Sequence, residues 1–335
     1  MAVSRSRDPI VVADAHWKSR GWDTGWHFRA SLSLYRTDDL ISEHDGAVMR
    51  PYGLTSAKHE ALAVLYFSRQ GDMPLGKLGE HLLVHPTSVT STVDALERLG
   101  LVTRASHPTD RRATLARITA KGRRAMRQTC SELGAKHSGL DALTAEDAEE
   151  LFDLLAKVRA DAGDLKRRDS DELPVDPALA DPVLEAEANW AREGWVDGPW
   201  FRAAFSIYRT AELIRLTNDD ALRPLKLTHV RHEALAVLFF SQAGEMPMGR
   251  LSERLLVHPT SVTSTVDTLQ RLGYVRRVPH PTDRRTTLAR ITPKGRRAVE
   301  SSIETMAAAR CGVGALSTAQ ARRVFNLLAK VRLPR

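Results

Sequence analysis

The chain contains a long internal repeat, and this repeat constrains the fold more than any other feature of the sequence. Residues 54–125 recur at residues 227–298 without a gap, at a constant offset of 173 positions, and about three quarters of the positions are identical. The same offset extends outward, so that Trp17 aligns with Trp190 and Phe152 with Phe325. Each copy is therefore as long as a globular domain, not a short solenoid repeat.

The repeat predicts two domains joined by a linker. We place copy one at residues 1–160, the linker at 161–187 and copy two at 188–335. The linker prediction rests on composition, because this stretch contains three prolines and many charged residues.

The central block of each copy predicts a helix-turn-helix. In copy one, a turn over 71–74 precedes a short helix over 75–83, and a tight connection leads to a second helix that begins at Pro86. Gly100 is placed to end this second helix. The apolar stripe that we expect to face the core consists of Val89, Val93, Leu96 and Leu99.

The opposite face of the second helix carries short hydroxyl side chains. An ordinary solvated face usually carries Lys and Glu, which favour helices more than Ser and Thr do. Short hydroxyl side chains allow close approach to a phosphate or a base edge, so we predict that this helix contacts double-stranded DNA. The predicted contact residues are Pro86, Thr87, Ser88, Thr90, Ser91, Asp94 and Arg98 in copy one, and Pro259, Thr260, Ser261, Thr263, Ser264, Asp267 and Arg271 in copy two.

A hairpin directly after this helix predicts a wing. Residues 101–105 and 114–118 have the composition of strands, and residues 107–110 form a turn between them. Arginine at the hairpin tip is often only a solvated charge, but beside a recognition helix it can enter the minor groove. The tip residues are Arg111, Arg112, Arg284 and Arg285, and further phosphate contacts are expected among Arg104, Arg117, Lys121, Arg123 and Arg124.

Aromatic residues recur in the first part of each copy, where helical spacing predicts a long helix that begins before Trp17. Two interpretations stay open: these rings fill the core, or they line a pocket for an aromatic ligand. The candidate ligand-binding residues are Trp17, Trp22, Tyr35, Trp190, Trp195 and Tyr208.

Metal, cofactor and redox chemistry have little support in the sequence. His59, His85 and His107 recur in copy two but fall on separate predicted elements, without the spacing of a metal site. Cys130 aligns with an isoleucine and Cys311 with a serine, whereas a duplicated thiol switch should recur. Because no phosphate loop, nucleophile motif or carboxylate pair is present, we predict no enzyme.

The composition is that of a globular protein with a basic surface. The formal net charge of +8 suggests an anionic partner, although many basic proteins bind no nucleic acid. We expect a cytoplasmic protein without a membrane association, because no apolar stretch has the length of a signal or a membrane span.

One motif carries a family resemblance. After Asp110-Arg111-Arg112, five residues lead to Ile118-Thr119-Ala120-Lys121-Gly122, and the pattern recurs over residues 283–295. Together with segments 54–69 and 75–100, it resembles the MarR family of bacterial transcriptional regulators over nearly all of each copy. The resemblance implies a mainly α fold with small β wings, in which terminal helices form a dimer interface. It also implies that a small aromatic compound releases the DNA.

The tandem arrangement departs from the single-domain homodimers of that family. Either the two copies pair within one chain as a pseudo-dimer with a pseudo-two-fold axis, or two chains assemble four domains. Glu149 and Glu150 align with Arg322 and Arg323, and such exchanges across an interface favour pairing of copy one with copy two. We predict a repressor that binds an inverted repeat, with half-site centres about 34–36 Å apart. The alternative is a protein-interaction module that binds no operator.

Overall fold

The computed structural model of the protein describes most of both copies. The described residues are 8–19, 21–22, 25–82, 84, 86–110, 113–165, 181–195, 198–241, 243–255, 259–283 and 286–333.

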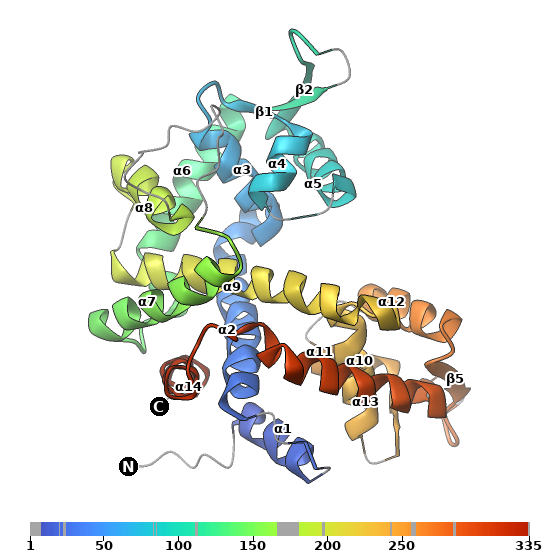
Figure 1. The fold of residues 1–335 in the computed structure, drawn as a ribbon. Helices are drawn as coiled ribbons and strands as arrows, with labels where there is room; N and C mark the ends of the chain where they lie inside the picture. Colours follow the sequence, from blue (N-terminus) through green and yellow to red (C-terminus); the bar gives the residue numbers. More distant parts are fainter. Residues whose placement is uncertain are drawn as a thin grey trace. The chain divides into compact units, whose positions relative to one another are not determined.

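Copy one and copy two form matching series of helices (Figure 1). The helices of copy one are α1 (Pro9–Lys18), α2 (Gly25–Met49), α3 (Ser56–Phe67), α4 (Leu75–Leu82), α5 (Pro86–Arg98), α6 (Ala120–Gly134) and α7 (Ala145–Asp161). Those of copy two are α8 (Pro182–Arg192), α9 (Pro199–Leu222), α10 (His229–Phe240), α11 (Met248–Leu255), α12 (Pro259–Arg271), α13 (Pro293–Ala308) and α14 (Thr318–Arg332).

Each copy also contributes one small antiparallel sheet. The strands are β1 (Asp72–Pro74), β2 (Val102–Ser106), β3 (Thr114–Ile118), β4 (Glu245–Pro247), β5 (Val275–Pro279) and β6 (Thr287–Ile291). The strand orders are β1-β3-β2 and β4-β6-β5, so that β2 and β5 lie at sheet edges. The fold class is therefore mainly α with small β wings, as predicted.

Three local predictions differ from the structure. Segment 71–74, predicted as a turn, contains β1, which pairs with β3 from Asp72 opposite Arg117 to Pro74 opposite Leu115. The predicted long first helix is divided into α1 and α2. Gly21 lies between the two helices and Gly25 is the first residue of α2, and both glycines have a positive φ. Residues 182–187, assigned to the linker by composition, belong to α8, because Asp181 caps this helix by accepting from the Val183 backbone amide.

The compact units of the molecule do not follow the order of the copies. Unit 1 combines Met1–Ser33 with Leu213–Phe325, and unit 2 combines Leu34–Glu212 with Asn326–Arg335. The division passes through α2, α9 and α14. The beginning of copy one therefore shares a unit with the winged helix of copy two, and the beginning of copy two shares a unit with that of copy one.

Aromatic packing explains unit 1. Trp17 of copy one is 7% exposed and stacks on Phe240 of copy two, with ring centroids 5.5 Å apart. Trp22 lies 5.7 Å from Phe239 of the same helix, α10. Because burial of such rings contributes several kcal/mol, about 1.5–3 for a single large side chain, the aromatic contacts hold the N-terminal helix of copy one on copy two.

Unit 2 repeats the exchange with the copies reversed. Trp195 of copy two is 9% exposed and lies 5.5 Å from Tyr66 and 6.1 Å from Phe67 of copy one. The approach is close: a Cβ atom added to Gly134 would lie 2.2 Å from the backbone oxygen of Trp195. The N-terminal segment of each copy therefore packs on the winged helix of the other.

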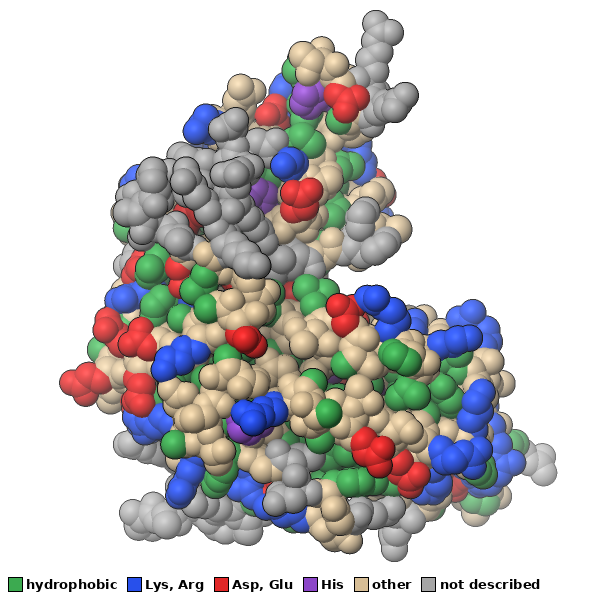
Figure 2. Space-filling model, in the orientation of Figure 1, with side chains coloured by type: hydrophobic (Ala, Val, Ile, Leu, Met, Phe, Trp, Pro, Cys, Tyr) green, Lys and Arg blue, Asp and Glu red, His purple; other side chains and the backbone are tan. Residues whose placement is uncertain are grey.

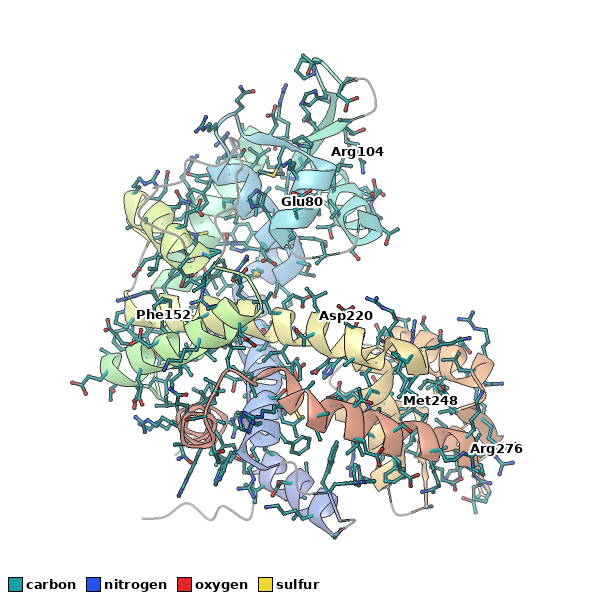
Figure 3. All side chains as sticks on the ribbon, in the orientation of Figure 1. Glu80, Arg104, Phe152, Asp220, Met248 and Arg276 are labelled. Carbon is teal, nitrogen blue, oxygen red and sulfur yellow. The ribbon has the colours of Figure 1, made fainter. Side chains whose placement is uncertain are left out.

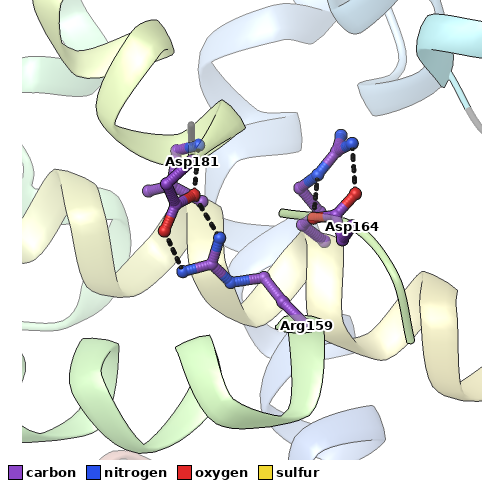
Figure 4. Close-up of polar contacts among 5 residues, drawn as sticks. Arg159, Asp164 and Asp181 are labelled. Atoms are coloured by element: carbon purple, nitrogen blue, oxygen red, sulfur yellow. Dashed lines mark hydrogen bonds and ion pairs between the residues drawn. The ribbon is translucent and has the colours of Figure 1, made fainter. Parts of the chain in front are cut away.

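Two buried ion pairs connect residues of the predicted linker to α7 and α9 within unit 2 (Figure 4). The fully buried guanidinium of Arg159 donates through both terminal nitrogens to Asp181, with one contact of 2.8 Å. The guanidinium of Arg209 on α9 donates twice to Asp164, at 2.6 Å each. Paired geometry of this kind satisfies buried charges that would otherwise be costly to desolvate.

Glu149, which aligns with an arginine of copy two, forms an ion pair in the structure. Its carboxylate accepts from Arg202 of copy two at 2.9 Å. The guanidinium of Arg322, which aligns with Glu149, lies 5.2 Å from the ring centroid of Trp26 in unit 1. The Arg202–Glu149 contact joins a helix of copy two to a helix of copy one within unit 2.

No helix in the described part of the chain is both long enough and apolar enough to span a membrane.

Candidate nucleic-acid interface

The second helix of each helix-turn-helix is amphipathic in the predicted sense. In α5, Val89, Val93 and Leu96 are buried, and Leu99 just beyond it is half-buried. The hydroxyl side chains face outward: Thr87, Ser88, Thr90 and Ser91 are exposed, as are Thr260, Ser261, Thr263 and Ser264 in α12. Pro259 is also exposed; the side chain of Pro86 lies outside the described part of the chain. Two helices thus present the same small polar surface.

Asp94 was predicted to contact DNA, and the structure gives its carboxylate another partner. Asp94 Oδ1 lies 2.5 Å from an Arg104 guanidinium nitrogen, and Glu97 Oε2 lies 2.6 Å from the other terminal nitrogen. In copy two, Asp267 pairs with Arg277 in the same way. These acidic residues hold the wing strand against the recognition helix.

The other basic residues near the wing of copy one are mostly engaged in the fold. Arg117 pairs with Asp72 across the sheet at 2.7 Å, and the guanidinium of Arg123 lies 5.6 Å from the ring centroid of Tyr66. Arg98 and Arg124 are exposed, and Arg98 donates to the backbone oxygen of Asp94 at 3.3 Å. The phosphate contacts predicted among these residues stay predictions.

The I-T-x-K-G motif caps the recognition helix. Thr119 donates to the Gly100 backbone oxygen at 2.8 Å, and Lys121 Nζ donates to that of Leu99 at 2.7 Å. Both satisfy carbonyl groups that follow the end of α5. Gly122 is required because an added Cβ would lie 2.3 Å from the Leu101 backbone oxygen. No signal in the sequence marks Lys121 as a cap, since a lysine beside a wing equally suits a phosphate.

The same capping geometry recurs in copy two. Thr292 donates to the Gly273 backbone oxygen at 2.7 Å, and Lys294 Nζ donates to that of Leu272 at 2.8 Å. A Cβ added to Gly295 would lie 2.1 Å from the Tyr274 backbone oxygen. The motif therefore orients both recognition helices alike.

A histidine shapes each wing turn. His107 Nδ1 accepts from the backbone amide of Asp110 at 3.1 Å, and His280 Nδ1 accepts from that of Asp283 at 3.2 Å. Both serve as turn residues, as predicted. The tip arginines Arg111, Arg112, Arg284 and Arg285 lie outside the described residues, as do His85 and His258.

The candidate ligand residues are divided between the two units. Trp17 and Trp22 lie in unit 1, whereas Tyr35, Trp190, Trp195 and Tyr208 lie in unit 2. Trp190 packs edge-on against Trp195, at 5.8 Å between ring centroids, and the Tyr208 hydroxyl donates to Asp45 at 3.0 Å. Within each unit the two tryptophans pack against each other, which favours the core interpretation of the tryptophans.

Buried histidine and cysteine side chains near this core are held neutral. Burial lowers the pKa of His59 to about 4, and its Nε2 lies 3.0 Å from the Thr129 hydroxyl oxygen. Burial raises the pKa of the neighbouring Cys130 thiol, so that the thiolate is disfavoured. Within the described ranges, no group of three or more His, Cys, Asp or Glu side chains has the geometry to hold a metal ion.

The fold and the exposed helix surface define a tandem winged helix-turn-helix protein. Comparison with known proteins agrees at the level of family. Models of the MarR family match residues 54–114 and 227–286.

Curated relatives cover single copies. The HTH-type transcriptional regulator MhqR of Bacillus subtilis is 32% identical over 132 residues, which is 39% of this chain and 90% of MhqR. YkoM of the same organism, an uncharacterised HTH-type transcriptional regulator, is 33% identical over 28% of this chain and 61% of YkoM.

Two solved structures are also similar to part of the chain. Sco5413, a MarR family transcriptional regulator from Streptomyces coelicolor, is 42% identical, with 39% of this chain and 91% of that chain covered and a TM-score of 0.37. MosR of M. tuberculosis, solved in complex with DNA, is 29% identical, with 30% and 72% covered and a TM-score of 0.28. The chain belongs to the MarR family, and the family model matches it twice.

Proposed function

We propose that the protein is a sequence-specific, DNA-binding transcriptional regulator. The observation that carries this proposal is the identical exposed hydroxyl surface of α5 and α12, each beside a β-hairpin. Short hydroxyl side chains near a helix N-terminus suit phosphate oxygens and base edges of the major groove. The tip arginines Arg112 and Arg285 would enter the adjacent minor groove.

One chain would supply both half-site readers. Exchange of the N-terminal segments supports pairing of the copies within a chain, since Trp17 of copy one packs on copy two and Trp195 of copy two packs on copy one. Two identical recognition surfaces would bind an inverted repeat with half-site centres about 34–36 Å apart. A dimer of chains is the competing arrangement.

Selection of bound fragments from random duplex DNA tests this proposal. The purified chain, at about 150 mM salt, should enrich an inverted repeat with half-sites one helical turn apart. A single half-site would overturn intrachain pairing but keep the regulator. No enrichment by folded protein would overturn the function and favour a protein-interaction module.

Substitution of the wing tips separates these two functions. We expect Arg112→Ala with Arg285→Ala to weaken operator binding at least tenfold, since a minor-groove arginine and its phosphate contacts are lost in both half-sites. Lys157→Ala, on the exposed surface of α7, is a control that removes one positive charge outside the winged helices. Equal affinity of the double variant and the control would contradict the DNA-binding function.

Repression and release by a small aromatic compound complete the proposal. A regulator bound across a promoter excludes polymerase, and a ligand that prefers the unbound conformation shifts the equilibrium away from DNA. A reporter gene behind the selected operator should rise in expression when the regulator is deleted. Salicylate, as a probe, should quench tryptophan fluorescence and weaken operator binding together; quenching without weakened binding would contradict the effector role.

A further inference from the structure

The DNA-binding surfaces of the two copies carry different charges around identical recognition residues. Over residues 72–121 and 245–294, three aligned positions change the formal charge, and each change makes copy two more positive. His81 is replaced by Arg254, Glu97 by Gln270, and Thr103 by Arg276. The positions lie on the first helix, the recognition helix and the wing, respectively.

In copy one, the wing arginine is neutralised twice. Arg104 is held by both Asp94 and Glu97, at 2.5 and 2.6 Å, and its side chain is 27% exposed. This trio carries a net charge of one negative unit beside the recognition helix. Because phosphate is anionic, an unbalanced carboxylate at this surface opposes DNA binding.

In copy two, the equivalent cluster is balanced. Arg277 pairs with Asp267, while Gln270 replaces the second carboxylate. The Arg277 guanidinium also lies 3.4 Å from the Thr263 backbone oxygen, so it stays close to the recognition helix. Removal of one negative charge therefore leaves the support of the wing intact.

Two further arginines add positive charge to copy two. Arg276 is exposed on the edge strand β5, and no acidic side chain within the described residues lies at ion-pair distance from it. Figure 3 shows Arg276 at the β5 end of unit 1 and Arg104 beside β2 in unit 2. Arg254 is exposed near the end of α11, the helix that crosses the DNA backbone in this class of motif.

The surface view agrees with this distribution. In Figure 2, Lys and Arg side chains gather over the end of unit 1 that carries α12 and β5. Over the wing end of unit 2, basic and acidic side chains are interspersed on the face shown.

We propose that copy two binds its half-site more tightly than copy one, through added phosphate interactions, although both copies read the same bases. This inference rests on the proposed function. Phosphate contacts position a protein on the duplex without carrying base information, so affinity and sequence preference can differ separately. Copy two engages DNA first and copy one completes the complex.

The test disables one recognition helix at a time in the full chain. Ser91→Glu and Ser264→Glu place the same charge at aligned, exposed positions of α5 and α12. The probe is a duplex of the enriched inverted repeat, and binding is measured from 50 to 200 mM salt. We expect Ser264→Glu to weaken binding at least fivefold more than Ser91→Glu at 150 mM. The binding that Ser91→Glu retains should depend more steeply on salt than the binding that Ser264→Glu retains. The slope of log affinity against log salt concentration should differ by about 0.9 for each added phosphate contact.

Charge exchange provides the matched control. His81→Arg, Glu97→Gln and Thr103→Arg, added to Ser264→Glu, should restore affinity and steepen the salt dependence. The reverse substitutions Arg254→His, Gln270→Glu and Arg276→Thr, added to Ser91→Glu, should weaken binding.

The outcomes separate the two proposals. If Ser91→Glu and Ser264→Glu weaken binding equally, with equal slopes, the asymmetry is wrong and the regulator stands. If neither substitution weakens binding, the helices do not read DNA and the proposed function fails with it. Charge exchanges without effect on slope would also overturn the phosphate explanation.

Discussion

The two winged helices carry the same recognition surface on supports that differ. Residues 86–94 and 259–267 are identical, and in both copies a threonine, a lysine and a glycine cap the recognition helix. The charges around this constant part differ. In copy one the wing arginine Arg104 pairs with two carboxylates, whereas in copy two Arg277 pairs with one. Under the proposed function, the side chains that would read bases and the charges that would set phosphate affinity can therefore vary separately.

The same contrast extends to the cores. Trp17 is the buried member of the first tryptophan pair and Trp22 is half-buried, whereas in the second pair Trp195 is buried and Trp190 is half-buried. Unit 1 also contains two low-pKa histidines, His229 and His232, where unit 2 has only His59 at the aligned positions. Equal topology therefore does not imply equal energetics.

The largest effect is expected from loss of a tryptophan that holds the N-terminal segment of one copy on the other copy. Trp17→Ala should destabilise unit 1 by about 3–5 kcal/mol, since a large buried ring is lost, and Trp190→Ala should cost unit 2 less. Hydrogen exchange of peptides from α10 and α3 measures the two units separately. Trp17→Ala should increase exchange in α10, and Trp195→Ala should increase it in α3. Faster exchange of α3 instead of α10 in Trp17→Ala would contradict the packing of each N-terminal segment on the other copy.

A second prediction concerns the buried ion pairs of unit 2. Arg159→Met removes the partner of Asp181 and leaves a buried carboxylate, so we expect a loss of about 3–5 kcal/mol. The double variant with Asp181→Asn should recover part of this loss, because the uncompensated charge is gone while the cap acceptor remains. Thermal unfolding of the single and double variants tests this; an unchanged midpoint for Arg159→Met would contradict the role of the pair.

The third prediction is that low pH destabilises the two units to different extents. Burial lowers the pKa of His59 and His232 to about 4, and burial with nearby positive charge lowers that of His229 to about 3. Each folded-state pKa lies below the ordinary histidine value of 6.5, so the unfolded chain binds more protons between these pH values. Stability is therefore complete above pH 6.5 and falls as the pH is lowered, by roughly 2–3 kcal/mol per histidine at pH 4.5.

Unit 1 should consequently unfold first on acidification, since it holds two of these imidazoles. His229→Ser introduces the residue that copy one has at Ser56 and should reduce the difference between the units. Hydrogen exchange at pH 7 and 4.5 provides the measurement. Acid loss confined to unit 2 would contradict the assignment.

The smallest effect is expected at an exposed contact. Arg202→Ala removes a pair with Glu149 at 2.9 Å and one with Glu187 at 3.2 Å, and exposed pairs contribute about 0–1 kcal/mol. Added salt should reduce this loss in the free energy of unfolding, because salt screens the attraction between exposed charges. A loss above 2 kcal/mol in denaturant unfolding would show that these charges support unit 2 more than their exposure indicates.

Much of each copy follows from local sequence. The stripe of Val89, Val93 and Leu96 predicts the buried face of α5, Gly100 with its φ of +71° ends the helix turn, and Thr119 and Thr144 cap the helices that follow. β1 was missed because three residues between a glycine and a helix show no alternation. The pairing of Asp94 with Arg104 was not anticipated, because an exposed carboxylate on a helix carries no sign of which arginine will reach it.

Local sequence alone predicts the two winged helix-turn-helix modules, the hydroxyl face of each second helix and the family, because periodicity, capping and turn chemistry act over short distances. Which N-terminal helix covers which winged helix depends instead on tertiary packing. Both copies present a Trp-Trp-Phe pattern to similar aromatic cores, at Trp17, Trp22 and Phe28 and at Trp190, Trp195 and Phe201. Hydrophobic burial is non-directional, so either pairing buries the same rings, and the choice depends on contacts between residues far apart in the chain.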